Sequence, residues 1–256
     1  MRRLKISFLR TVLLIFIFLS STLLVSISSM AQKGTGFIGV SGGISLPMGN
    51  WGKSNYIVST TGFANDPSGF ANKGGFGSID GAWFFSRHFA VGALFNYGTY
   101  KTKDLEVLSG GYRESFDVDQ VTTTANSYKM WSLMPGLYFN YPIVKKLSLT
   151  ARALAGITHA TTPTIAVAVE DGGIDDGTFE QKSASKTAFG FDGGVGLSYA
   201  IAKCLAINLR GDYFYSKPDF TIDNTQRQNS AGRLVTDYNQ ALAGINVSLG
   251  VALRIH

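Results

Sequence analysis

The sequence predicts an all-β protein in which eight antiparallel strands run up and down and close into a barrel. Three observations support this. Apolar and polar residues alternate over long segments, a unit of strand, tight turn and strand recurs every 58 residues, and both ends of the expected sheet fall at one level. Alternation with a period of two places successive side chains on opposite faces of a strand. The 30 glycines and 12% aromatic residues are also typical of β architectures.

The first 31 residues are expected to form a cleaved secretory signal peptide. Four basic residues among the first ten precede an apolar run from about residue 12 to 25, and Ser29 and Ala31 are the small residues that signal peptidase requires. An uncleaved membrane anchor is the alternative. The segment has no acidic residue, so its removal lowers the net charge from +6 to +2. Residues 32–256 are expected to form one barrel domain.

The remaining composition excludes several classes of protein. No basic patch is large enough to indicate nucleic-acid binding. Cys204 is the only cysteine, so no internal disulfide can form. No apolar run after the signal peptide reaches the length of a transmembrane helix.

Eight alternating segments can be placed along the chain. They span residues 36–48, 74–85, 89–101, 128–141, 147–160, 187–200, 204–216 and 239–255. Three connections are tight and lie around Arg87, Lys145 and Lys203. The other four are long and polar and are expected to be loops, at residues 49–73, 102–127, 161–186 and 217–238.

The tight turns recur with a spacing of 58 residues, and so do the aromatic residues before them, Trp83, Tyr141 and Tyr199. Extending this series backwards from 87 gives 29, and extending it forwards from 203 gives 261. Both ends of the sheet then lie level with the tight turns, as a closed barrel requires if its first and last strands are to pair. A coincidence of loop lengths is the alternative explanation.

The polar face of the strands favours a narrow lumen over an aqueous surface. A soluble barrel would carry many Lys and Glu residues there. This face instead consists of Gly, Ser, Asn and Thr with three acidic and three basic residues, which are Asp80, Arg152, Asp192, Arg210, Asp212 and Arg254. We expect these six charges to pair inside the barrel, because buried charges need partners. A selectivity constriction is the alternative.

The apolar face is continuous, and aromatic residues lie at both of its ends. Those near the tight turns are Trp83, Phe85, Phe89, Phe139, Tyr141 and Tyr199, and those near the long connections are Trp131, Phe189, Tyr213 and Tyr215. Two aromatic girdles around an apolar band of roughly 25 Å are typical of transmembrane barrels. The sequence therefore predicts a barrel of the bacterial outer membrane, with outer-membrane lipid against its apolar face. A secreted, soluble lipocalin-like barrel remains the alternative.

Two further stretches resemble the small outer-membrane β-barrel family of the OmpA/OmpX type, in the glycine-rich form common in Bacteroidota. They are "GVSGGISLPMGNW" at residues 39–51 and "SLGVALRI" at residues 248–255. The second resembles the signal that the barrel-assembly machinery recognises, through Ser248, Gly250, Leu253 and Ile255, although it ends in Ile-His rather than an aromatic residue. The resemblance implies an architecture, whereas the activities of family members range from structural barrels and adhesins to channels and lipid-modifying enzymes.

Candidate chemistry is sparse. His159 is the one candidate base for a lipid-modifying enzyme, and no motif supplies it with a nucleophile or an orienting acid. The acidic stretch "VEDGGIDDGTFE" at residues 169–180 does not match a calcium-loop spacing and is expected to be solvated. The sequence predicts no enzyme activity, no metal and no cofactor.

We therefore expect a non-enzymatic protein that stabilises the envelope or contacts an extracellular partner through its long connections. Exposed aromatic residues are expected there, including Trp51, Tyr56, Phe63, Phe70 and Tyr112. Loops on a rigid scaffold are where such barrels act. Transport of a small or apolar solute and lipid modification around His159 are the other two hypotheses.

Overall fold

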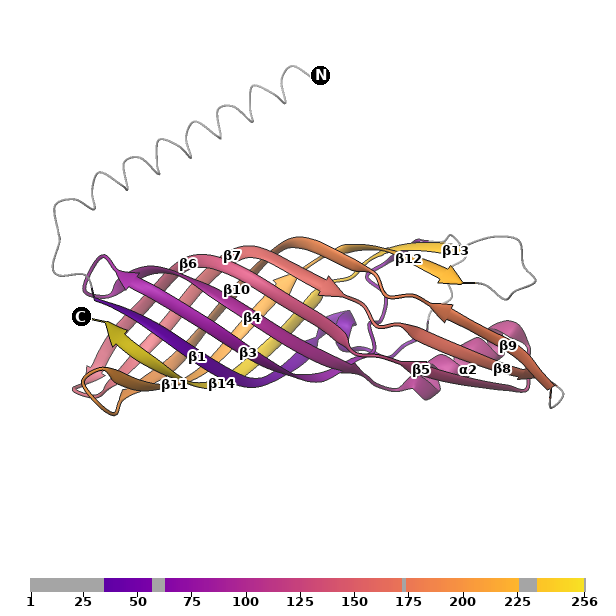
Figure 1. Ribbon diagram of the computed structural model, residues 1–256, viewed down its shortest axis with the longest axis horizontal. Coiled ribbons are helices and arrows are strands. Elements are labelled where there is room, and N and C mark those ends of the chain that lie inside the picture. Colours follow the sequence, from indigo (N-terminus) through magenta and orange to yellow (C-terminus); the bar gives the residue numbers. More distant parts are fainter. Residues whose placement is uncertain (1–34, 57–62, 172–173, 226–233, 256) are drawn as a thin grey trace, which may run out of the picture.

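A computed structural model describes residues 35–56, 63–171, 174–225 and 234–255, and its main element is a closed barrel of eight antiparallel strands (Figure 1). In chain order the barrel strands are β1 (Gly36–Met48), β3 (Ala71–Phe84), β4 (Phe89–Thr102), β6 (Tyr128–Val144), β7 (Leu147–Thr161), β10 (Ser185–Ala200), β11 (Leu205–Ser216) and β14 (Leu242–Ile255). Each strand pairs with the barrel strands before and after it, and β1 pairs with β14. The predicted fold class is confirmed.

The three tight turns lie where the 58-residue repeat places them. They connect β3 to β4, β6 to β7, and β10 to β11. The end of the barrel that carries these turns also carries the start of β1 and the end of β14, as the register of Gly36 opposite Ile255 requires. We call it the turn end and the opposite end the far end. Figure 1 shows the turn end on the left.

Alternation along each strand separates an exposed apolar face from a buried lumen. In β14 the exposed residues include Val247, Leu249 and Val251, whereas Asn246 and Ser248 between them are buried. The same pattern holds in β6, where Leu133 and Leu137 are exposed and Met134 is buried. A water-soluble barrel places its apolar residues inside, so this inverted arrangement requires an apolar solvent outside.

The prediction that the four long connections are simple loops is wrong. They form a second sheet of six strands in the order β2-β13-β12-β9-β8-β5. The strands are β2 (Phe63–Asn65), β5 (Gln120–Ala125), β8 (Ile165–Asp171), β9 (Ile174–Gln181), β12 (Asp219–Thr225) and β13 (Leu234–Asn239). The helix α2 (Leu105–Phe116) packs against β5. Figure 1 shows this sheet continuing beyond the far end of the barrel.

Two apolar clusters lie inside the barrel. The cluster nearer the turn end contains Ala82, Ala90, Leu94, Met134, Tyr138 and Leu154, with Phe37 and Phe84 packed against it. The cluster at the far end contains Trp51, Ala71, Tyr100, Tyr128, Met130, Ala160, Phe214, Phe220 and Leu242. No helix among the described residues is long and apolar enough to cross a membrane.

Candidate functional site

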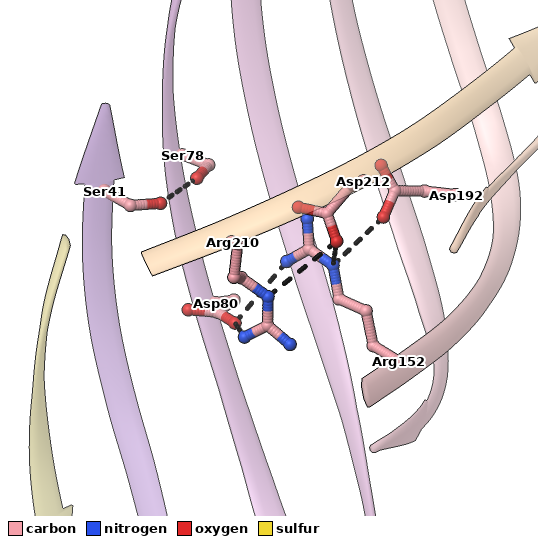
Figure 2. Close-up of polar contacts among 7 residues, drawn as sticks. All are labelled: Ser41, Ser78, Asp80, Arg152, Asp192, Arg210 and Asp212. Atoms are coloured by element: carbon pink, nitrogen blue, oxygen red, sulfur yellow. Dashed lines mark hydrogen bonds and ion pairs between the residues drawn. The ribbon is translucent and has the colours of Figure 1, made fainter. Parts of the chain in front are cut away.

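Five of the six charged residues singled out in the sequence lie together in the lumen, beside the turn-end apolar cluster. Asp80, Arg152 and Asp192 stand directly opposite members of that cluster on neighbouring strands, which are Leu94, Tyr138 and Leu154. Arg152 is central: its Nε lies 3.0 Å from Oδ1 of Asp192 and 3.0 Å from Oδ1 of Asp212, and its Nη1 lies 3.6 Å from Oδ2 of Asp80. Arg210 makes longer ion pairs, with Nη1 at 3.9 Å from Asp80 and Nε at 3.8 Å from Asp212. Figure 2 shows both guanidinium groups between Asp80 on one side and Asp192 and Asp212 on the other. We call these five residues the charge layer.

Glycines on neighbouring strands leave room for this layer. Gly194 stands opposite both Arg152 and Asp212, and a Cβ atom there would overlap the Asp212 side chain. Gly196 stands opposite Arg210, where a Cβ atom would lie 2.7 Å from Cγ of the arginine. An eight-stranded barrel is only wide enough for its side chains, so large residues on adjacent strands must face small ones.

The layer holds three carboxylates and two guanidinium groups, all buried. Buried charges are costly unless they are paired and hydrogen-bonded. Pairing is strongest around Arg152, whose Nε donates a hydrogen bond to Asp212 Oδ1. Above the layer, the hydroxyls of Ser41 and Ser78 lie 2.6 Å apart (Figure 2). The layer therefore fixes β3, β7, β10 and β11 relative to one another across the lumen.

Arg254, the sixth charged residue, does not join the layer. Its side chain lies at the turn end, where it lines a cavity together with Arg87 and Arg210. The two-residue period of β14 places Arg254 on the lumen face, but the position lies next to the end of the strand. The odd or even position of a residue along a strand predicts the face on which its side chain lies, but not its position along the barrel axis.

Trp51 is buried at the far end of the barrel, although the sequence predicts that it is exposed. Its side chain is 1% exposed. Its ring centroid lies 4.6 Å from that of Tyr100, 5.9 Å from that of Tyr128 and 6.0 Å from that of Phe214. Trp51 belongs to the short 3-10 helix η2 (Gly49–Gly52), which follows β1 directly, and Gly49 has a φ of 62°. That left-handed conformation favours glycine and begins the turn that directs Trp51 inward.

Hydrogen bonds of Asp66 connect the segment that follows Trp51 to other elements at the far end of the barrel. Asp66 Oδ1 accepts from the backbone N–H of Ala241 at 2.8 Å and from Nε2 of Gln240 at 3.2 Å. Asn50 Nδ2 donates to Asp66 Oδ2 at 2.9 Å. Tyr128 donates its hydroxyl to the carbonyl of Gly69 at 2.8 Å. The segment from Asn50 to Gly69 is thus bonded to β6 and to the residues just before β14.

The other four aromatic residues expected to be exposed also differ from that expectation where the structure describes them. Phe70 is buried. Tyr112 and Tyr56 pack edge to face, with their ring centroids 5.3 Å apart. Burial raises the pKa of Tyr112 to about 12. The side chain of Phe63 lies outside the described residues. Phe70 is therefore not part of a free surface, and Tyr56 and Tyr112 are half-buried against each other.

The aromatic residues of the expected girdles lie mainly on the outer surface. Near the turn end, Trp83, Phe85, Phe89, Tyr141 and Tyr199 are exposed and Phe139 is half-buried. Near the far end, Phe189 and Tyr213 are exposed, whereas Trp131 and Tyr215 are half-buried. In the expected assembly signal, Leu253 and Ile255 are exposed, Ser248 is buried and Gly250 is half-buried.

His159 lies on the outer side of β7, close to the far end. Its ring stacks on Trp131 with a centroid distance of 5.4 Å, and Nδ1 lies 2.9 Å from the hydroxyl of Thr187. Among the described residues, His159 makes no hydrogen bond or ion pair with a carboxylate. The arrangement lacks the orienting acid that an activated nucleophile usually needs.

Several solved structures are similar to this chain. One is Neisserial surface protein A (NspA), with 12% identity, a TM-score of 0.43, and 85% of this chain and 96% of that chain covered. Another is a major outer membrane protein from Thermus thermophilus, with 12% identity, a TM-score of 0.46, and coverage of 88% and 100%. A third is OprG from Pseudomonas aeruginosa, with 11% identity, a TM-score of 0.44, and coverage of 86% and 96%. No curated protein matches the sequence significantly.

The family comparison covers almost the whole chain. Residues 17–254 match the model of the outer membrane protein beta-barrel domain. This match agrees with the closed barrel of eight strands and with its exposed apolar face. The chain therefore belongs to the outer membrane protein beta-barrel domain family and is a small barrel of the bacterial outer membrane.

Proposed function

We propose that the chain is a non-enzymatic outer-membrane protein whose lumen is closed by its own side chains and which acts through the structure beyond its far end. The observation that carries the proposal is the position of Trp51, buried across the far mouth of the barrel above the charge layer. Because a barrel of eight strands has little interior space, one aromatic layer and one charged layer are enough to exclude a continuous water path.

The orientation follows from the lengths of the connections. Barrels of this kind have short periplasmic turns and longer extracellular connections. The turn end then faces the periplasm, and the second sheet with α2 faces the cell exterior. We call the second sheet and α2 the platform.

The platform supports a role in contact rather than in transport. It adds six strands and a helix to the outer end of a rigid barrel, and rigid scaffolds commonly present binding surfaces in this way. A groove with a volume of about 560 Å³ is lined by residues of α2, of β5 and of the turn between them. Leu105, Glu106, Arg113, Asp119 and Gln120 are among the residues that line it. A mixed lining of this kind suits a polar partner surface better than an apolar solute.

Conductance in planar lipid bilayers tests the closed lumen. The purified, refolded chain is expected to produce no steps of nanosiemens size, and liposomes that contain it are expected to take up small solutes no faster than empty liposomes. A general porin in the same bilayers is the positive control. Regular nanosiemens openings, or solute uptake above that of empty liposomes, would contradict the proposal and favour a transport role.

A hairpin deletion tests the platform separately. Residues 165–181, which form β8 and β9, are replaced by a short Gly-Ser turn, because this hairpin lies entirely outside the barrel strands. The variant is expected to insert and to keep the heat-modifiable gel migration of a folded barrel. In cells that lack the protein, it is expected not to restore the envelope or adhesion phenotype that the whole chain restores. Full restoration would place the function in the barrel itself.

A further inference from the structure

The turn end of the lumen contains a cavity that the proposed function does not use. Its volume is about 220 Å³, and it is lined by residues of β1, β3, β6, β7, β10, β11 and β14 and of the turn before β4. Its polar lining includes Arg87, Arg210, Arg254, Tyr138, Asn140 and Asn208. The charge layer and the turn-end apolar cluster separate it from Trp51 and the platform. It therefore opens towards the periplasm if the turns face that compartment.

The cavity is positively charged. Three arginines line it, and among the described lining residues none is acidic. Arg87 and Arg254 lie near the opening, at the tight turn and next to the end of β14, whereas Arg210 is 8% exposed and reaches the cavity from the charge layer. The guanidinium group is planar, keeps its charge at all relevant pH values, and presents donors that match carboxylate and phosphate oxygens.

Two buried groups in the lining have unused donors. Among the described residues, neither Nε nor Nη2 of Arg210 has a hydrogen-bond partner, and neither has the hydroxyl of Tyr138, a residue that is 3% exposed. The carboxylates nearest to Arg210 lie at ion-pair rather than hydrogen-bond distances, at 3.9 Å for Asp80 and 3.8 Å for Asp212. Buried polar groups are nearly always hydrogen-bonded. Asp80 Oδ2 and Asp212 Oδ2 in the charge layer also have no hydrogen-bond partner, so Arg210 can satisfy its donors within the layer or on a ligand.

The remaining walls are aromatic. Phe37 packs edge to face on Tyr138 with a centroid distance of 5.7 Å, and it lies 6.5 Å from Phe84. All three rings line the cavity. A ligand that occupies it would thus meet arginine and tyrosine donors on one side and ring faces or edges on the other.

We propose that this cavity binds a small organic anion from the periplasmic side, with one phosphate or carboxylate group held by the arginines and Tyr138 and an apolar part held by Phe37 and Phe84. A cavity of this volume is several times the roughly 30 Å³ that one water occupies in the liquid. It can therefore accept a charged group together with a ring of about six atoms. The site lies on the opposite side of the charge layer from the platform and is independent of any partner there.

Calorimetric titration of the whole refolded chain in a non-ionic detergent at low salt tests the proposal, with phenyl phosphate as the probe. Saturable binding at one site is expected. Arg254→Gln and Arg87→Gln are each expected to weaken binding about tenfold, since each removes a charge-assisted contact. Tyr138→Phe is expected to weaken it less, because only one neutral donor is lost. Lys182→Gln just after β9 is the control, with the same change of charge outside both cavities, and is expected to leave the affinity unchanged.

Two other probes test the anion-binding part and the apolar part of the site separately. Inorganic phosphate is expected to bind more weakly than phenyl phosphate, because it cannot contact the rings, and benzyl alcohol is expected not to bind. Equal affinity for the two phosphates would overturn the apolar half of the assignment. Tight binding of benzyl alcohol, unchanged affinity in both arginine variants, or no saturable binding of phenyl phosphate by about 10 mM would overturn the anion site. Heat-modifiable migration shows that each variant is folded, and Arg87 and Arg254, away from the charge layer, are chosen so that folding is retained.

Discussion

Arg152 donates a hydrogen bond from Nε to Asp212 Oδ1 at 3.0 Å, although the strands that carry the two residues are not neighbours. Arg152 lies on β7 and Asp212 on β11, with β10 between them. The bond therefore crosses the inner face of β10, at the level where Gly194 has no side chain to obstruct it. It connects β7 and β11, which are not joined directly by backbone hydrogen bonds.

Replacing Arg152 by alanine is expected to destabilise the barrel by about 3–5 kcal/mol, because three buried carboxylates would be left with one guanidinium group. The measurement is the urea midpoint in lipid vesicles, followed by heat-modifiable migration. Arg113→Ala on α2 is the control and is expected to change the midpoint little, since Arg113 is exposed. Equal midpoints for the two variants would mean that the charge layer contributes nothing to stability.

Two adjacent glycines of β1 are expected to respond differently to the same substitution. A Cβ atom at Gly43 points into the lumen and would overlap the carbonyl oxygen of Val247, whereas one at Gly42 would lie 3.5 Å from the carbonyl oxygen of Phe76. Gly43→Ala is expected to cost about 1–3 kcal/mol through overpacking, and Gly42→Ala is expected to be tolerated. Folding yield and urea midpoints of the two variants provide the comparison, and the reverse order would contradict the register of β1.

Fluorescence quenching by lipids with brominated acyl chains is expected to distinguish two tryptophans. Trp83 is exposed on the outer surface of β3, whereas Trp51 is enclosed by Tyr100, Tyr128 and Phe214. A variant that retains only Trp83 is expected to be strongly quenched, and a variant that retains only Trp51 is not. The other tryptophans are replaced by phenylalanine in each case. Strong quenching of Trp51 would mean that its segment lies against lipid.

Cys204 reports the orientation of the barrel. It is a free, exposed thiol beside the tight turn between β10 and β11. A membrane-impermeant maleimide is expected to leave it unlabelled in intact cells and to label it once the outer membrane is permeabilised. The control carries Cys204→Ser and Lys182→Cys, which places the thiol just after β9 and is expected to react in intact cells. Labelling of Cys204 from outside would invert the assigned topology.

The barrel could be predicted from the sequence because each strand lies between two very different environments. In segments such as Ala241–Ile255 one face is apolar throughout and the other carries Asn246, Ser248 and Arg254, so the period of two is strong and long. The members of the charge layer could be identified from the sequence for the same reason, because the odd or even position of a charged residue along its strand indicates whether it faces the lumen. The odd or even position does not give the distance of a residue from the end of the barrel. The sequence therefore predicts that Arg254 pairs with the other five charged residues, although it does not contact them.

The platform was missed because its strands are short and lack this contrast. In "QVTTTA" of β5 only Val121 and Ala125 are apolar, and in "IAVAVED" of β8 the alternation extends over only three large apolar residues, Ile165, Val167 and Val169. The two strands pair with each other although they are distant in sequence. Trp51 was misplaced for a related reason. Its burial depends on contacts with strands that are distant in sequence, such as the contact with Tyr100. The one local signal is Gly49, whose left-handed conformation begins the turn that contains Trp51.

The hydrogen bonds between β1 and β14 have a kinetic consequence. The first strand has no partner on one side until the last strand has been delivered, because Gly36 lies opposite Ile255. Contacts between such distant positions are slow to form, and an unclosed sheet would expose unpaired amides to hydrocarbon. Insertion is therefore expected to be cooperative, with the polypeptide held in an unfolded, escorted form while it crosses the compartment between the two membranes.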